Sequence, residues 1–152
     1  VSTLLPSGRW GELKGLAVAT GPGGFTGTRL SVVMARTLAQ QLGCPLLGVS
    51  SFALMASRLA PDEQPFWITQ PLPRRGVVAG QYRVRAAVVE ELEAPHLLEA
   101  DRIVSPAIEA AVDVDADVEA LLGRLRQALQ QGEPLPWQPV LPIYPTSPVG
   151  PV

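Results

Sequence analysis

The sequence is poor in several residue types, and each shortage excludes a class of protein. It has one cysteine, Cys44, so one chain cannot build a disulfide framework, and a reducing compartment is indicated. Its one histidine, His96, stands in neither an H-x-x-x-H nor a C-x-x-C spacing, so we expect no metal site. Among 12 basic residues Lys14 is the only lysine, and no basic block occurs. We therefore expect no direct binding of nucleic acid by this chain alone.

Long apolar runs are missing as well. No stretch approaches the roughly 18 residues of a membrane span, and no charged-then-apolar leader opens the sequence. These patterns predict a soluble, cytoplasmic protein that does not contact membranes. The first residue is Val1 rather than methionine, which leaves a truncated start open. With 47% hydrophobic residues in a chain of 152, a packed core is expected.

The hydrophobic pattern of the first part predicts an α/β arrangement. The expected elements are a strand at 13–20, a glycine-rich loop at 21–27, a helix at 28–42, a strand at 46–49 and a helix at 52–59. Either Ser50 or Ser51 can cap the second helix. A strand–helix–strand crossover this short predicts parallel, neighbouring strands.

The second half is less regular. We expect strands at 66–70 and 77–84, and residues 86–92 either extend the second strand or form a third. A helix is predicted at 117–131, where the apolar residues share one face. Prolines dominate the last part, which we expect to be extended or loosely ordered. The predicted organisation is a first lobe at 1–62, a smaller lobe at 63–132 and a proline-rich tail at 133–152.

The glycine-rich loop is the clearest candidate for a binding site. Between a strand and a helix N-terminus, exposed backbone N–H groups favour an anion. A Walker A loop is excluded because Gly27 is followed by Thr28 and Arg29 instead of lysine, and a dinucleotide fingerprint fails because its third glycine is replaced by Thr26. A tight turn that needs glycine for positive φ remains the plain alternative. The candidate phosphate or nucleotide contacts are Gly21, Gly23, Gly24, Thr26 and Gly27.

The complete string in this region carries a resemblance to a known family. Gly-Pro-Gly-Gly-Phe-Thr-Gly-Thr-Arg at 21–29 precedes a helix rich in small residues and then Pro-Leu-Leu-Gly-Val-Ser-Ser at 45–51. This order resembles the TsaB (YeaZ-type) signature Gly-Pro-Gly-Ser-Phe-Thr-Gly-x-Arg, with its strand that ends in Gly-Val-Ser. Gly24 stands where the family usually has serine. TsaB proteins are paralogues of TsaD (Gcp, M22 glycoprotease-like) proteins.

The resemblance implies an actin-like/sugar-kinase fold of the ribonuclease H-like type. The family's first strands would precede residue 13, and the sequence does not contain them. The implied function is that of a non-catalytic partner subunit in tRNA N6-threonylcarbamoyladenosine modification. Its partners would be a TsaD-like subunit, a TsaE-like ATPase and a second copy in a homodimer, with tRNA contacted only indirectly. No catalytic residue and no cofactor is expected on this chain, while ATP and a metal ion are expected on the partner.

The helix at 28–42 is implied to be the partner-binding element. One face carries the small residues Thr28, Ser31, Ala35 and Ala39, which would let a partner helix approach closely. The other face carries an apolar stripe that we expect to be buried: Leu30, Val33, Met34, Thr37, Leu38, Gln41 and Leu42. The alternative is that both faces are buried within the monomer.

Two other functions stay open. The glycine loop is compatible with a nucleotide-binding ATPase or kinase-like enzyme of the actin-like class, which would need carboxylates to hold Mg²⁺ near the phosphates. The nearest acid in sequence is Glu12, while Asp113, Asp115 and Asp117 are typical of a solvated run that caps a helix. The remaining possibility is a degenerate domain kept only for interaction.

Overall fold

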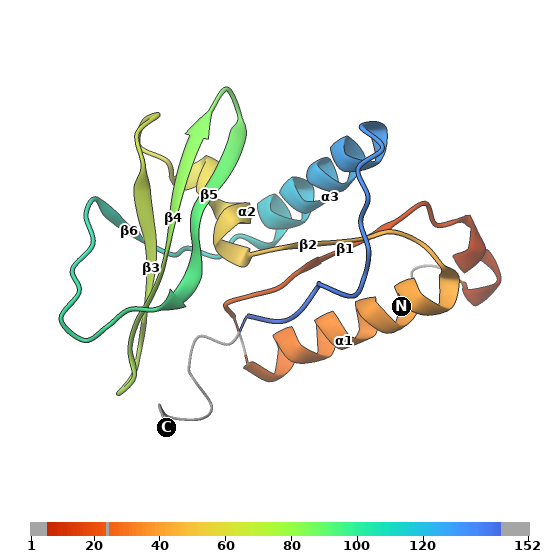
Figure 1. Ribbon diagram of the computed structural model, residues 1–152, viewed down its shortest axis with the longest axis horizontal. Coiled ribbons are helices and arrows are strands. Elements are labelled where there is room, and N and C mark those ends of the chain that lie inside the picture. Colours follow the sequence, from red (N-terminus) through yellow and green to blue (C-terminus); the bar gives the residue numbers. More distant parts are fainter. Residues whose placement is uncertain (1–5, 24, 144–152) are drawn as a thin grey trace.

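The computed structural model describes residues 6–23 and 25–143. In this part of the chain the strands form two sheets, which lie side by side with α2 between them (Figure 1). The elements in chain order are η1 (Ser7–Glu12), β1 (Leu16–Ala19), α1 (Phe25–Leu42), β2 (Leu46–Val49), α2 (Ser51–Leu59), β3 (Phe66–Leu72), β4 (Gly76–Arg85), β5 (Val88–Leu97), β6 (Ala107–Glu109) and α3 (Val114–Gln130). The predicted mixed α/β class is confirmed.

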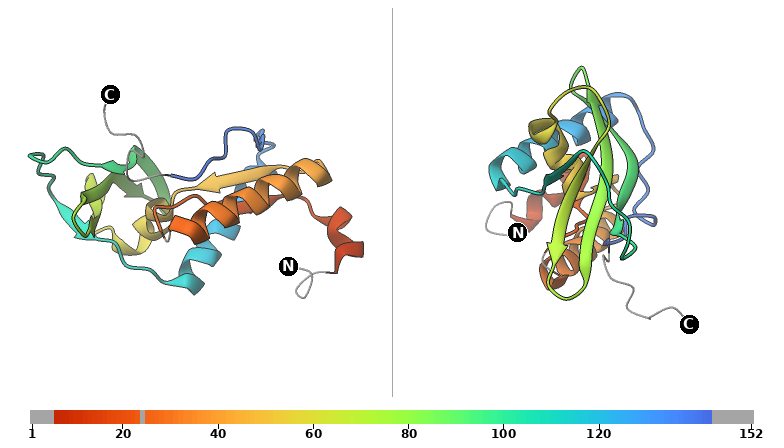
Figure 2. Two further views of the ribbon diagram at one scale, coloured as in Figure 1. Left: turned by 90° about the horizontal axis from the view of Figure 1, so that it is seen from below. Right: turned by 90° about the vertical axis from the view of Figure 1, so that its left-hand side faces the viewer.

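The smaller sheet pairs β1 with β2 in parallel, as the short crossover predicts. Leu16 lies opposite Leu46, and Ala19 lies opposite Val49. Helices α1 and α3 lie on opposite sides of this sheet, as Figure 1 and Figure 2 together show. A parallel pair is stable when both faces are covered, and these two helices provide the cover.

The three α-helices follow the sequence signals with some differences at their N-termini. Helix α1 begins at Phe25 rather than at residue 28, so the predicted loop is shorter than expected. The Ser50 side chain caps α2 by accepting a hydrogen bond from the Ala53 N–H, which confirms one of the two predicted caps. Helix α3 begins at Val114, and the Asp113 carboxylate caps it.

The larger sheet has the strand order β5-β4-β3-β6. Strands β3, β4 and β5 are antiparallel neighbours, and β6 pairs in parallel with β3. Residues 86–92 belong partly to a separate strand, because the chain turns at Ala86 and Ala87 before β5 begins. The sequence pattern missed β6, which has only three residues and so too little length for a period to show.

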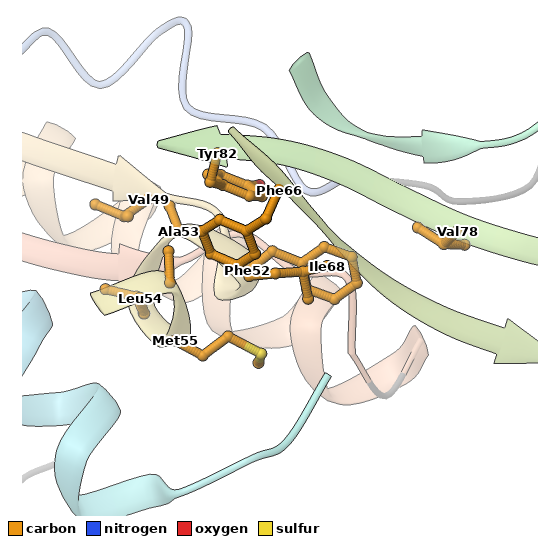
Figure 3. Close-up of a cluster of buried hydrophobic side chains, with 10 residues drawn as sticks. Val49, Phe52, Ala53, Leu54, Met55, Phe66, Ile68, Val78 and Tyr82 are labelled. Atoms are coloured by element: carbon orange, nitrogen blue, oxygen red, sulfur yellow. The ribbon is translucent and has the colours of Figure 1, made fainter. Parts of the chain in front are cut away.

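The largest hydrophobic core lies where α2 meets the larger sheet (Figure 3). Its fully buried side chains include Phe52 from α2, Phe66 and Ile68 from β3, and Tyr82 from β4. A second, smaller core lies between α1 and the two-stranded sheet, with Val32 and Leu46 at its centre. The larger core therefore joins residues on both sides of the predicted lobe boundary at 62/63.

The segment after α3 returns along the first sheet and packs against it. The Leu46 N–H donates to the Leu135 carbonyl oxygen, and the Ile143 N–H donates to that of Thr20. The Val140 side chain is buried in the smaller core, and the Trp137 ring stacks with the Arg36 guanidinium. Of the two predicted alternatives, extended or loosely ordered, the loosely ordered one is wrong for 133–143, because this segment packs against the first sheet. Residues 144–152 lie outside the described part.

Candidate functional site

The glycine turn lies where β1 and β2 both end and where α1 and α2 both begin. Its backbone is tied to each neighbour by hydrogen bonds: the Thr20 N–H donates to the Val49 carbonyl oxygen, and the Ser51 N–H donates to that of Gly21. Helix N-termini that meet at the carboxyl ends of parallel strands are a usual place for ligands in α/β proteins. The fold therefore places the turn in a location where an anion is electrostatically favoured.

Two of the candidate glycines have steric reasons to be glycine. Gly21 has φ of 97°, a conformation that residues with a Cβ rarely adopt. A Cβ at Gly23 would lie 3.0 Å from the Thr28 hydroxyl oxygen, and one at Gly21 would lie 3.1 Å from the Thr28 methyl carbon. Thr28 therefore packs back against the turn. The plain alternative of a tight turn accounts for Gly21 and Gly23 without any ligand.

The remaining predicted contact residues are Gly24, Thr26 and Gly27. Gly24 lies outside the described residues. Thr26 and Gly27 belong to the first turn of α1 rather than to a loop, and the Thr26 side chain is not among the described ones. Phosphate contact by these residues stays a prediction.

A polar cluster beside the turn, formed by two buried hydroxyls and the exposed Glu91, was not predicted from the sequence. The Ser50 hydroxyl and the Tyr82 hydroxyl both donate to Oε2 of Glu91, at 2.6 and 2.9 Å. The two hydroxyl oxygens lie 3.2 Å apart, so α2, β4 and β5 meet at one carboxylate. Ser50 also caps α2, and Glu91 thus places a negative charge at that helix N-terminus.

This cluster weakens the case for a Mg²⁺–nucleotide site at α2. Glu91 uses one carboxylate oxygen for two protein hydrogen bonds. Among the residues that the structure describes, no group of three or more His, Cys, Asp or Glu side chains could hold a metal ion. His96 contacts the Ala94 carbonyl oxygen and Glu93 on the surface.

The cluster predicts a specific pH dependence of stability. Burial raises the pKa of the Tyr82 phenol well above its ordinary value, and the nearby Glu91 raises it further. A raised folded-state pKa means that the stabilising contribution is complete below the unfolded-state pKa of about 10 and is lost as the pH rises above it. For Tyr82→Phe we expect a loss of about 1–2 kcal/mol at pH near 7 and a smaller difference from the unchanged protein near pH 11. Urea unfolding at both pH values measures this, and a difference independent of pH would contradict it.

The faces of α1 are oriented opposite to the prediction. Ala39 has 0% of its surface exposed, and Ala35 is partly buried against the same small core, next to Val32. The larger apolar residues face outward instead: Leu30 is 61%, Val33 52% and Met34 51% exposed. Of the predicted small-residue face, only Ser31 is exposed, since Thr28 packs on the turn. Leu38 and Leu42 of the larger stripe are partly buried, but its predicted burial is wrong for the exposed Leu30, Val33, Met34, Thr37 and Gln41. Ala39 has no exposed surface for a partner.

Comparison with known proteins identifies the family that this chain resembles. The model of the family described as "TsaD: tRNA N6-adenosine threonylcarbamoyltransferase" matches residues 8–120. The Bacillus subtilis (strain 168) protein "tRNA threonylcarbamoyladenosine biosynthesis protein TsaB" is 44% identical over 46 residues, which cover 30% of this chain and 20% of that protein. The aligned part is thus about a fifth of that relative's length.

Solved structures from Pseudomonas aeruginosa share the fold. One, described as an uncharacterized protein with similarity to peptidase YEAZ, superposes with a TM-score of 0.68 at 19% identity and covers 93% of this chain and 85% of its own. Another, YeaZ, gives a TM-score of 0.67 at 22% identity and covers 89% of this chain and 76% of its own. The architecture is therefore that of the YeaZ-like α/β proteins. The chain belongs to the family of that model, TsaD: tRNA N6-adenosine threonylcarbamoyltransferase, and within the family it is similar in sequence to TsaB and in fold to YeaZ.

No helix within the described ranges has both the length and the apolar character needed to cross a membrane.

Proposed function

We propose that this protein is a non-catalytic partner subunit in tRNA N6-threonylcarbamoyladenosine modification, and that it acts in the cytoplasm by binding a TsaD-like subunit. The family match supports the pathway, and the name of the Bacillus subtilis relative refers to the same biosynthesis. The first sheet with α1 would be part of an actin-like lobe. In this proposal nucleotide and metal would be held by the partner. Contact with a TsaE-like ATPase and tRNA would occur through that partner.

The observation that carries this proposal is the exposed apolar face of α1. Leu30, Val33 and Met34 lie one helical turn or less apart and expose more than half of their surface. An exposed apolar patch on one helix is typical of a surface that a partner covers. Of the small residues predicted for this role, Ala35 and Ala39 pack instead against the sheet of the same chain. The proposed interface is therefore the outward face of the same helix, which would serve a homodimer as well.

A charged substitution on this face tests the proposal. For Val33→Arg we expect binding to the TsaD-like subunit of the same organism to weaken at least about tenfold, because an arginine would be placed in the apolar centre of the interface. Titration calorimetry measures the affinity. The control is Ile103→Arg in the loop before β6, an apolar residue that is 92% exposed and does not belong to an apolar helix face. We expect this control to bind normally.

The binding results distinguish a failure of the proposed function from a wrong assignment of the interface. If the unchanged chain forms no complex with the TsaD-like subunit at micromolar concentration, the proposed function is wrong for this chain. If the complex forms and both variants bind equally well, α1 is not the interface.

A further inference from the structure

A cleft of about 290 Å³ lies between α2, α3 and the start of β5. Its walls are mainly apolar and include Ala53 and Leu54 from α2 and Val88 from β5. Three polar side chains also line it, namely Ser57, Arg124 and Gln127. An apolar hollow with a few polar groups is the usual composition of a site for a small molecule. The volume lies at the low end for such sites, which favours a ligand of few atoms.

Arg124 differs from the other arginines in comparable surroundings. Three of the arginines in the described part of the chain are partly buried: Arg36, Arg83 and Arg124. Arg36 donates to the Gln138 carbonyl oxygen, and Arg83 forms an ion pair with Glu90. Arg124 has neither an ion pair nor a hydrogen bond to any residue that the structure describes. Its charge acts on the Tyr82 hydroxyl, but its N–H groups have no acceptor among the described residues. A partly buried guanidinium whose donors have no protein acceptor is suited to an anion from outside.

At two places along this cleft the residue type is unfavourable for the local backbone conformation. Ala86 and Ala87, with φ of 49° and 65°, form a turn whose positions ordinarily take asparagine and glycine, and Ala87 lines the cleft. Gly123 lies within helix α3, where glycine is disfavoured, and it too lines the cleft. A Cβ at Gly123 would meet no atom within 4 Å, so packing does not require a glycine there. Local costs of this kind concentrate at functional sites.

We infer that this cleft binds a small monoanionic carboxylate, with its charged group on Arg124 and its short hydrocarbon part against Ala53, Leu54 and Val88. Arginine is the side chain whose geometry matches a carboxylate in two parallel hydrogen bonds. The Gln127 amide and the Ser57 hydroxyl add uncharged donors. The Arg124 guanidinium can neutralise one negative charge between the apolar walls. A dianion would bring a second, uncompensated charge into a site that is only partly exposed to water. This inference is independent of the proposed partner binding.

The test is a titration of the whole chain with butyrate, followed by amide chemical shifts in ¹H–¹⁵N spectra. We expect saturable shifts at Ala87, Val88 and Gly123, with a dissociation constant on the order of 1 mM for so small a ligand. Butanol, which lacks the charge, and inorganic phosphate, which is a dianion at higher pH, are expected to bind at least about tenfold more weakly. The absence of saturable shifts with butyrate, or equal binding of butanol or phosphate, would overturn the inference.

Two variants test the assignment of the residues. Arg124→Gln removes the cation, and we expect butyrate binding to weaken at least about tenfold. Its control is Arg126→Gln on the same helix, an exposed residue that does not line the cleft and should leave binding unchanged. Gly123→Leu puts a side chain into the open space and should abolish binding while the charge stays in place. Undiminished binding in either Arg124→Gln or Gly123→Leu would contradict the proposed site.

Discussion

Replacing Ala39 with arginine is expected to destabilise the folded protein strongly rather than to block an interface. Ala39 has 0% of its surface exposed and packs with Val18 and Leu46 in the smaller core. An arginine at this position would place an unpaired charge among apolar side chains, because none of the neighbours in that core is acidic. The free energy of unfolding should fall by about 3–5 kcal/mol, a large part of the total for a domain of this size.

Val33→Arg is the matched control for this prediction. It introduces the same side chain into the same helix, but Val33 is 52% exposed, so its free energy of unfolding should change by no more than about 0.5 kcal/mol. Urea unfolding followed by circular dichroism compares both variants with the unchanged chain. If Ala39→Arg folded with normal stability, the small-residue face would be a surface after all, and the orientation of α1 described above would be wrong.

The faces of α1 show a limit of hydrophobic periodicity. Both faces of this helix carry apolar residues, small ones on one face and larger ones on the other, so a period near 3.6 is present on each. The buried face is determined by a segment distant in sequence, because Trp137 and Val140 pack beside Val32 and Ala35. The sequence pattern, which predicts an extended or loosely ordered segment there, does not indicate this packing. The helix, the sheet and the returning segment lie close together, and small side chains on the buried face of the helix permit this close packing.

Sequence signals from neighbouring residues predicted the local structure correctly where a residue type has a single structural role. The serine before α2 caps it, the β2 strand has the predicted bounds, and Asp113 caps α3 as expected for the acidic run. Glu91 could not be placed near the glycine turn from the sequence, although the register of β4 and β5 puts it opposite Tyr82. That register follows from the turn at Ala86 and Ala87, which lacks the glycine or asparagine that normally identifies a two-residue turn.

The predicted boundary between residues 62 and 63 can be tested through the larger core. Phe52 precedes the boundary and is 1% exposed, and it packs with Phe66, Ile68 and Tyr82, which follow it (Figure 3). Truncation to alanine would leave a cavity shared by α2 and the larger sheet. For Phe52→Ala we therefore expect the free energy of unfolding to fall by about 3–5 kcal/mol.

The two sheets should respond together to that cavity. Trp67 in β3 reports on the larger sheet, and Trp137 beside α1 reports on the smaller core, so each can be followed in a variant where the other tryptophans are phenylalanine. We expect both probes to give one coincident transition that Phe52→Ala shifts to lower urea by the same amount, because a shared core couples the parts that it joins. Leu122→Ala on α3, where the leucine is 44% exposed, should shift neither probe appreciably. Two separate transitions would mean that the chain folds as two independent units. Displacement of the Trp137 signal alone would support a division at 62/63, and displacement of the Trp67 signal alone would place the division before α2.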